Sequence, residues 1–165
     1  MPQASRYNGE HKMRQNTSAE NTQRALQSPQ QQAADFGSVR QAHRMETTED
    51  YVELIDDLIR SSGEARLVDI AVRLGVSQPT VSKTLARLQR EGFVTSEPYR
   101  SVFLTEKGKL LADQTRERHD TVYRFLRTLG VSDKIAKRDS EGLEHHVSTE
   151  TLRAFRRFMR QYRST

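Results

Sequence analysis

The sequence predicts a mainly α-helical protein that contains one short β-hairpin. Beyond residue 44, apolar residues recur at helical spacing in six segments, and Gly, Ser and Pro interrupt the pattern between them. Two short β-prone runs, at residues 93–94 and 102–104, flank a loop that contains Pro98, as expected for a hairpin. Residues 1–44 are rich in Gln, Ser, Asn and Ala and show no apolar period, so we expect a disordered polar leader there.

Residues 67–94 predict two short helices joined by a tight turn. The turn falls at Gly75, and Gly92 follows the end of the second helix. The second helix buries one apolar face and leaves a polar and basic face exposed. Two helices of this kind, followed by a β-hairpin, are typical of a winged helix-turn-helix DNA-binding domain. A simple helical hairpin is the alternative, but it would not explain the β-prone runs that follow.

The exposed face of the second helix carries the candidate contacts to double-stranded DNA. Residues at the start of such a helix reach base edges, so Lys83 is suited to guanine and Gln78 to adenine. Arginines further along the helix and at the tip of the hairpin are suited to phosphates, which position a protein without specifying a sequence. Simple solvation of a surface is the alternative explanation. The predicted DNA-binding residues are Gln78, Pro79, Thr80, Ser82, Lys83, Arg87, Arg90 and Arg100.

Composition narrows the class of protein. The 165 residues carry a net charge of +5, which suits a polyanionic partner. No run of 18 apolar residues and no signal peptide is present, and there is no cysteine, so we expect a cytoplasmic protein without a membrane span, a disulfide or a thiolate metal site. The predicted division is a leader at 1–44, a DNA-binding domain at 45–104 and a helical dimerisation and metal-binding domain at 105–165.

The first helix is expected over residues 45–61, with Thr47 or Thr48 as its N-cap. This helix is unusually acidic, with six carboxylates and Arg60 as its only base. The helix dipole explains acids in the first turn, including Glu49 and Asp50. Glu53, however, shares a face with Asp50 at i+3, where two carboxylates repel each other unless a positive charge lies between them.

Three further helices are expected after the hairpin. Thr105 is the predicted N-cap of a long helix that runs to about residue 128, and Ser132 and Ser148 are the predicted N-caps of the next two. His119 falls on the inner stripe of the long helix, where a satisfied core histidine is the ordinary interpretation. Because these helices have apolar stripes that a winged helix alone does not cover, we expect a second copy of the chain to cover them.

The segment 139–146 holds the residues with the clearest metal-binding chemistry. On a helix, Glu141, Glu144 and His145 stand at i, i+3 and i+4 and point the same way. Two carboxylates and an imidazole without a thiolate suit manganese or ferrous iron. From this pattern alone, an acidic helix face with an incidental histidine is an equal alternative.

Between residues 49 and 160 the chain resembles the diphtheria toxin repressor family of metal-dependent repressors, in particular its short manganese-responsive branch. The resemblance rests on EDYVELIDDLI, LGVSQPTVSK, VFLTEKG, RERH and GLEHHVS. It implies a winged helix that binds DNA, a helical domain that dimerises and metal ions between the two. The implied metal ligands are Asp50, Glu53, His119, Glu141, Glu144 and His145.

The same resemblance bears on the choice of metal. The iron-responsive branch has a Cys where this chain has Glu141 and a Met where it has Asp50, and oxygen ligands at both positions favour Mn²⁺ over Fe²⁺. One or two ions per subunit are expected. The implied function is a homodimeric regulator, not an enzyme, in which metal acts as corepressor at palindromic operators of manganese transport genes and no small organic substrate is bound.

Three alternatives remain at this stage. The first is an iron-responsive repressor of the same family. The second is a winged-helix regulator with a non-metal effector, which gives no reason for the acidic pair on the first helix to coexist with GLEHH. The third is a metallohydrolase or oxygenase, which would leave the recognition surface and the hairpin unexplained and would need an open coordination position.

Overall fold

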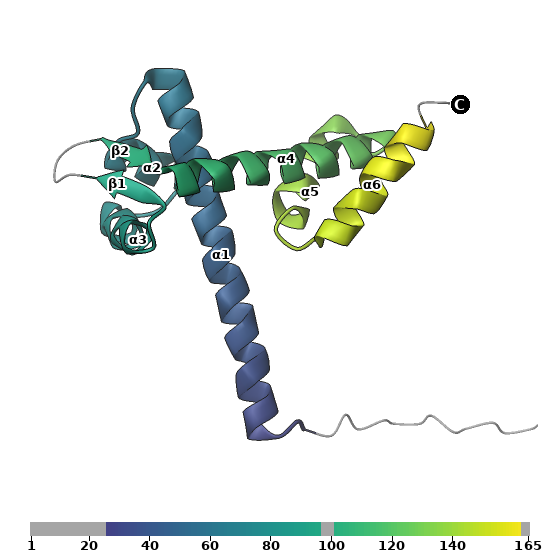
Figure 1. Ribbon diagram of the computed structural model, residues 1–165, viewed down its shortest axis with the longest axis horizontal. Coiled ribbons are helices and arrows are strands. Elements are labelled where there is room, and N and C mark those ends of the chain that lie inside the picture. The colour runs from purple at the N-terminus through teal and green to yellow at the C-terminus, as the bar shows by residue number, and fades with distance from the viewer. Residues whose placement is uncertain (1–25, 97–100, 163–165) are drawn as a thin grey trace, which may run out of the picture.

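The computed structural model describes residues 26–96 and 101–162, and its mainly helical architecture confirms the predicted class (Figure 1). The long first helix crosses the fourth, the helix-turn-helix and hairpin lie on one side of this crossing, and the last two helices lie on the other. The elements are α1 (Pro29–Ser62), α2 (Leu67–Leu74), α3 (Gln78–Arg90), β1 (Val94–Ser96), β2 (Val102–Leu104), α4 (Glu106–Thr128), α5 (Asp133–Leu143) and α6 (Thr149–Tyr162).

The C-terminal half of α1, the helix-turn-helix and the hairpin share one apolar core. Ile55, Ile70, Val81 and Leu88 are fully buried in it. β1 pairs antiparallel with β2, and Ala65 forms an additional bridge to β2. The predicted winged helix-turn-helix is therefore confirmed, whereas the hairpin tip that contains Pro98 and Arg100 lies outside the described residues.

The first helix starts 16 residues earlier than expected, at Pro29 instead of position 45. The prediction of a disordered leader is thus wrong for residues 29–44, while residues 1–25 lie outside the described part. The Ser28 hydroxyl accepts a hydrogen bond from the Gln31 amide at 3.2 Å, and Pro29 occupies the first turn. Because the buried half of α1 has already nucleated the helix, a polar segment rich in Ala and Gln extends it without forming a core.

The expected caps at Thr47 and Thr48 are also wrong, because both residues lie inside α1. Their hydroxyls donate to the backbone oxygens of His43 and Arg44, four residues earlier, at 2.9 Å each. The N-caps expected further along the chain agree better with the structure. Thr105 accepts from the Gly108 amide at 3.1 Å and Ser148 from the Thr151 amide at 3.1 Å, while Ser132 takes the N-cap position without a side-chain hydrogen bond.

The second half of the chain is a three-helix unit of α4, α5 and α6, with Val122, Ala136 and Leu152 buried between them. It leaves an aromatic surface uncovered. The rings of Phe125 and Phe155 stack with centroids 3.8 Å apart, and Phe158, which is 41% exposed, meets Phe125 edge-on. We call the exposed residues Phe158 and Tyr162, with the Phe125–Phe155 pair beneath them, the aromatic face.

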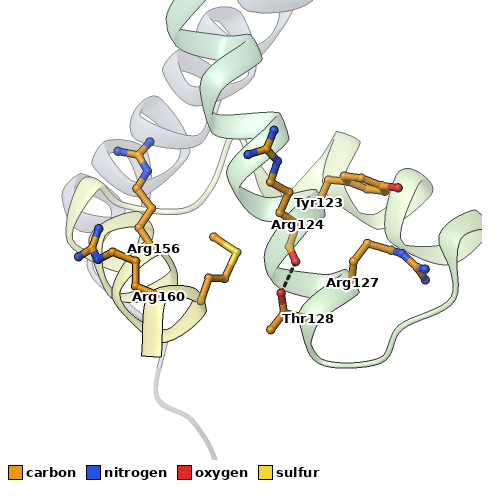
Figure 2. A pocket seen from close by; sticks show the side chains of 7 residues that line it. Tyr123, Arg124, Arg127, Thr128, Arg156 and Arg160 are labelled. Atoms are coloured by element: carbon orange, nitrogen blue, oxygen red, sulfur yellow. Dashed lines mark hydrogen bonds between the residues drawn. The ribbon is translucent and has the colours of Figure 1, made fainter. Parts of the chain in front are cut away.

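A basic hollow of about 580 Å³ opens between the same two helices, α4 and α6 (Figure 2). The arginines in its lining are held by neighbouring groups: Arg124 pairs with Asp120, and Arg156 pairs with Glu117. Four of the seven residues that line the hollow are arginines, so its lining is basic. It is lined by Tyr123, Arg124, Arg127, Thr128, Arg156, Met159 and Arg160.

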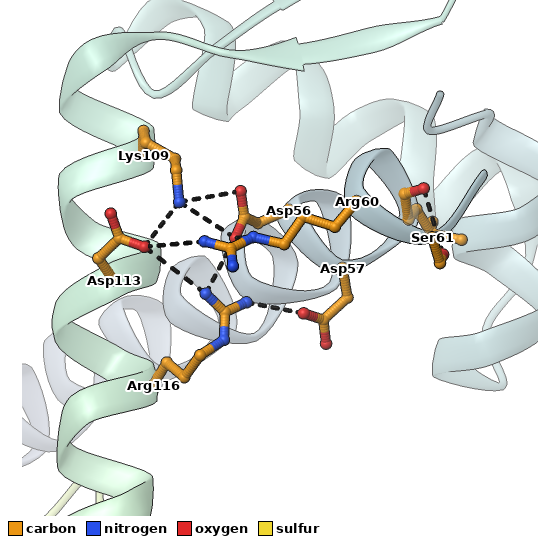
Figure 3. Close-up of polar contacts among 8 residues, drawn as sticks. Asp56, Asp57, Arg60, Ser61, Lys109, Asp113 and Arg116 are labelled. Atoms are coloured by element: carbon orange, nitrogen blue, oxygen red, sulfur yellow. Dashed lines mark hydrogen bonds and ion pairs between the residues drawn. The ribbon is translucent and has the colours of Figure 1, made fainter. Parts of the chain in front are cut away.

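A network of ion pairs joins α1 to α4 (Figure 3). Asp56 is its centre: its side chain is 5% exposed and lies 2.7 Å from Arg60 Nε, 3.0 Å from Arg116 Nη1 and 3.2 Å from Lys109 Nζ. Burial alone would raise the pKa of Asp56, but the hydrogen bonds from Arg116 and Lys109 outweigh it and hold the pKa below its usual value. The network joins the two helices where they cross.

Replacing Asp56 with asparagine is expected to lower the free energy of unfolding by about 2 kcal/mol at pH 7. Since the pKa of Asp56 is lower in the folded state, this contribution is complete above the unfolded pKa of about 4 and is lost as pH falls through the folded value. Urea unfolding of both proteins at fixed concentration, at pH 7 and near pH 3, should show the difference shrinking. Asp35→Asn, on the exposed part of α1, is the matched control. An equal loss in both variants would contradict the assignment.

None of the helices in the described ranges is both long and apolar enough to cross a lipid bilayer.

Candidate metal centre and DNA-binding surface

The predicted metal ligands converge where α1 crosses α4 and the turn after α5 returns to them. α5 ends at Leu143, so Glu144 and His145 lie in this turn, but Glu144 keeps helical backbone angles and the predicted spacing holds. The His145 side chain is 6% exposed. Its Nε2 atom lies 3.3 Å from Asp50 Oδ1 and 3.6 Å from Glu144 Oε1. A residue of the DNA-binding half thus contacts a histidine of the three-helix unit that also contacts Glu144.

Glu144 lies between the two histidines. Its Oε2 atom lies 2.6 Å from His119 Nδ1, and its side chain is 2% exposed. Although these atoms are close, Glu144 Oε2 is buried and accepts no hydrogen bond of good geometry from the described residues. Glu141, which is largely exposed, is further out, with Oε1 3.7 Å from His119 Nδ1. The buried Glu144 oxygen therefore remains available as a ligand.

Electrostatics mark the cluster as rich in negative charge. Burial, followed by the charge of Glu144, raises the pKa of Glu53 to about 7. Hydrogen bonds to Asp50 and Glu49 raise the pKa of His145 to about 10, and the adjacent Glu144 carboxylate raises the pKa of His119. A carboxyl group whose pKa is raised by burial and by a neighbouring carboxylate indicates a place where additional positive charge would be favourable.

The donor set suits a divalent cation of the manganese or iron type, because it combines carboxylate oxygens with imidazole nitrogens and has no thiolate. The donors, however, are paired with one another. As the side chains lie, no group of three His, Asp or Glu residues within 26–96 and 101–162 is arranged to hold a metal ion. A chain of contacts runs from Asp50 to His145, from His145 to Glu144 and from Glu144 to His119. Glu141 stands at the edge, and Glu53 is linked to the group by its charge interaction with Glu144.

Glu49 belongs to this cluster, although the sequence interpretation assigned it only to the helix dipole. Its Oε2 atom lies 2.7 Å from His145 Nδ1 and its Oε1 atom 2.5 Å from Arg118 Nη2. Burial would raise the pKa of Glu49, but His145 and Arg118 outweigh it and hold the pKa below its usual value. A signal was present in the sequence: Glu49, Val52 and Asp56 stand at i, i+3 and i+7, and all three are buried.

The predicted DNA-contacting face of α3 is exposed. Ser77 caps the helix, and its hydroxyl lies 2.8 Å from that of Thr80. Lys83 and Arg90 project from the same helix with exposed side chains. Arg100 lies outside the described residues, so its role stays a prediction. The predicted contacts that the structure places on the exposed surface are Gln78, Pro79, Thr80, Ser82, Lys83 and Arg90.

Arg87 differs from the expectation of a phosphate contact. Its Nη1 atom donates to Thr48 Oγ1 at 3.0 Å and to Glu91 Oε2 at 3.0 Å. Glu91 in turn pairs with Arg44. Since Thr48 is buried on α1, two residues before Asp50, Arg87 ties the recognition helix to the ligand-bearing turn of α1.

Replacing Arg87 with glutamine is expected to lower the free energy of unfolding by about 1 to 2 kcal/mol, because it removes hydrogen bonds between charged or buried groups. Arg90→Gln, on the exposed end of α3, should change it by less than about 0.5 kcal/mol. Urea denaturation measures both. If Arg87→Gln left stability intact but reduced the slope of log K against log salt for DNA binding by about 1, the phosphate role would be right after all.

Two family models match the chain. Residues 43–102 match the iron-dependent repressor, N-terminal DNA-binding domain, and residues 105–164 match the iron-dependent repressor, metal-binding and dimerisation domain. The transcriptional regulator MntR of Escherichia coli O6:H1 is 60% identical over 127 residues, which cover 77% of this chain and 82% of that protein. The HTH-type transcriptional regulator MntR of Geobacillus kaustophilus is 41% identical over 104 residues, covering 63% and 74%.

Solved structures show the same similarity. The structure of the manganese regulator SloR matches with a TM-score of 0.60 and 27% identity, covering 68% of this chain and 53% of that one. A manganese-dependent transcriptional repressor in complex with manganese matches with a TM-score of 0.60 and 28% identity, covering 66% and 50%. The chain therefore spans about half the length of these two solved chains.

Proposed function

Because the chain belongs to the iron-dependent repressor family of DNA-binding, metal-dependent regulators, we propose that it is a manganese-responsive transcriptional repressor whose divalent metal joins its two halves. Like these relatives, which are named as transcriptional regulators, it is a regulator and not an enzyme. One observation carries the proposal: Asp50, on the helix that supports the DNA-binding domain, lies 3.3 Å from His145 of the three-helix unit, and the same His145 nitrogen lies 3.6 Å from Glu144.

The mechanism rests on how these residues are distributed. Asp50 and Glu53 move with the DNA-binding domain, which we place at residues 45–104, and the other ligands belong to the dimerisation domain at residues 105–165. A bound cation supplies the positive charge that neutralises these carboxylates and joins both groups. The ligands then hold α1 at a fixed angle to α4. The residues that would hold the metal are Asp50, Glu53, His119, Glu141, Glu144 and His145.

Manganese is favoured over iron by the oxygen ligands Asp50 and Glu141 and by similarity to proteins named as manganese regulators. Glu141 is the edge ligand, so a Glu141→Cys variant should shift the response toward softer metals. Competition between Mn²⁺ and Cd²⁺ for the protein measures this preference, and an unchanged ratio of affinities would exclude Glu141 as a selectivity ligand. Up to two ions per subunit are consistent with six ligands.

The aromatic face supplies the surface for a homodimer. Two recognition helices in a two-fold dimer read half-sites about 34 to 36 Å apart, or a multiple of that distance, so a palindromic operator is the matching DNA. If the angle between α1 and α4 varies, the separation of the two α3 helices in the dimer varies too, and the affinity of the dimer for the operator falls. Metal therefore acts as corepressor, in the cytoplasm, at operators of manganese transport genes.

The test is DNA binding by fluorescence anisotropy at fixed ionic strength, with a palindromic operator and metal-free protein titrated with Mn²⁺, Fe²⁺ under anaerobic conditions, or Zn²⁺. Manganese should raise the affinity at least tenfold, which is a coupling of about 1.4 kcal/mol. Operator DNA must then tighten manganese binding by the same factor. Equal DNA affinity with and without metal would refute the metal switch and point to another effector.

A further inference from the structure

We propose that Glu49 and Arg118 are positioning residues for the metal ligand His145, which they orient so that its Nε2 atom faces the other ligands. The proposal rests on the proposed function, because it assigns roles around the same metal centre. Neither residue belongs to the set of ligands inferred from the sequence. Together they connect α1, α4 and the turn after α5 through one buried chain of polar contacts.

The chemistry of the two ring nitrogens gives the first argument. The Glu49 Oε2 atom lies 2.7 Å from His145 Nδ1, and a carboxylate oxygen accepts hydrogen bonds, so the geometry points to Nδ1 as the nitrogen that carries the proton and donates it. That contact turns the other ring nitrogen, Nε2, toward Asp50 and Glu144. Histidine ligands commonly donate their second ring N–H to a carboxylate, which fixes both the tautomer and the ring orientation.

The second argument is that both oxygens of Glu49 are already engaged. While Oε2 accepts from His145, Oε1 pairs with Arg118 Nη2 at 2.5 Å. The Glu49 side chain is 8% exposed, so it lies inside the protein with these two partners. A carboxylate held between an imidazole and a guanidinium has no oxygen left to face Asp50 and Glu144. This distinguishes it from Asp50, which is half exposed and contacts the ring on the Nε2 side.

The third argument concerns Arg118. Besides Glu49, its Nη2 atom donates to Thr115 Oγ1 at 3.2 Å, whereas its buried Nε atom has no hydrogen-bond partner among the described residues. Burying a guanidinium with an unsatisfied N–H is unfavourable, so the residue is held there by its contact with Glu49. Arg118 directly precedes His119 on α4. The pair Glu49–Arg118 thus fixes His145 relative to the helix that carries the other histidine ligand.

The experiment compares Mn²⁺ binding by wild-type protein, Glu49→Gln, Glu49→Asp and Arg118→Gln, with Glu46→Gln as the control on the same helix. Free Mn²⁺ is counted by its electron paramagnetic resonance signal in metal-free protein titrated without DNA. Glu49→Gln should raise the dissociation constant about 10- to 100-fold while the number of ions bound at saturation stays the same. Glu49→Asp, which keeps the charge, should recover part of the loss, and Arg118→Gln should show a smaller loss of the same kind.

Several outcomes would overturn the inference. If the Mn²⁺ dissociation constant of Glu49→Gln lay within twofold of that of Glu46→Gln, Glu49 would not act on His145. Loss of a bound ion at saturation would show that Glu49 is itself a ligand. If wild-type protein binds no Mn²⁺, the proposed function fails as well, so the two failures are distinguishable. Circular dichroism checks that each variant is folded.

A measurement on the wild-type protein alone keeps the inference testable if a variant fails to fold. In protein loaded with diamagnetic Cd²⁺, the ¹⁵N resonances of the His145 ring should show the proton on Nδ1. A proton on Nε2 would place the metal on the opposite nitrogen and contradict the assigned role of Glu49.

Discussion

Replacing Glu144 with glutamine is expected to abolish the increase in DNA affinity that manganese produces, a loss of tenfold or more. Glu144 is the most buried of the proposed ligands and the one that contacts both histidines, through Oε2 to His119 and Oε1 to His145. Glutamine keeps the shape but removes the charge, and its amide nitrogen offers no lone pair to a metal. Anisotropy with operator DNA, at saturating Mn²⁺ and without metal, measures the ratio directly.

Glu150→Gln is the matched control, because Glu150 is an exposed acid at the start of α6. It should keep the full response. Without metal, Glu144→Gln should bind DNA no more weakly than wild-type protein, since removing one carboxylate relieves repulsion in the cluster. A Glu144→Gln protein that still gained tenfold in affinity with Mn²⁺ would place the metal elsewhere.

Replacing Phe158 with aspartate is expected to convert the protein from dimer to monomer at micromolar concentration. Phe158 lies at the centre of the aromatic face, between Phe125 at 5.8 Å and Tyr162 at 6.0 Å between ring centroids. A buried charge at the centre of an interface commonly costs more than 2 kcal/mol, so the dimer dissociation constant should rise at least about 30-fold. Sedimentation velocity over a range of concentrations measures the shift.

Phe36→Asp is the control for this variant, since Phe36 is an equally apolar, exposed residue on the N-terminal part of α1, far from α6 in the chain. It should leave the dimer intact. The monomeric Phe158→Asp protein should also lose most of its affinity for a palindromic operator, because only one recognition helix remains per molecule. Dissociation by Phe36→Asp instead of Phe158→Asp would move the dimer interface to α1.

Much of the fold could be predicted from local patterns. The turn at Gly75, the apolar face of α3 and the short β-prone runs each depend on residues close in sequence, and the structure confirms them. The N-terminal part of α1 could not be predicted in this way, because it has no buried face and therefore no apolar period. What makes it helical is its continuity with the buried half, together with the cap at Ser28.

The candidate site was harder to predict because its geometry depends on packing between distant elements. Local spacing could align Glu141, Glu144 and His145, but only the crossing of α1 and α4 brings Asp50 to His145. Arg87 and Glu49 were misinterpreted for one reason: each has a charged side chain, and charged side chains usually lie on the surface. Here Thr48 and Glu91 engage Arg87, while His145 and Arg118 engage Glu49.

Because α1 is one unbroken helix of 34 residues, a small rotation at its ligand-bearing turn displaces its N-terminal end by a larger distance. The ligand-bearing turn lies about 30 Å along the helix from Pro29, at 1.5 Å per residue. A rotation of roughly 10° at that turn would sweep the free end of the helix through about 5 Å. Fluorophores placed near residue 33 of each subunit would therefore report a small reorientation of the DNA-binding domains as a measurable change in energy transfer. This position contacts neither the proposed metal ligands nor the recognition helix.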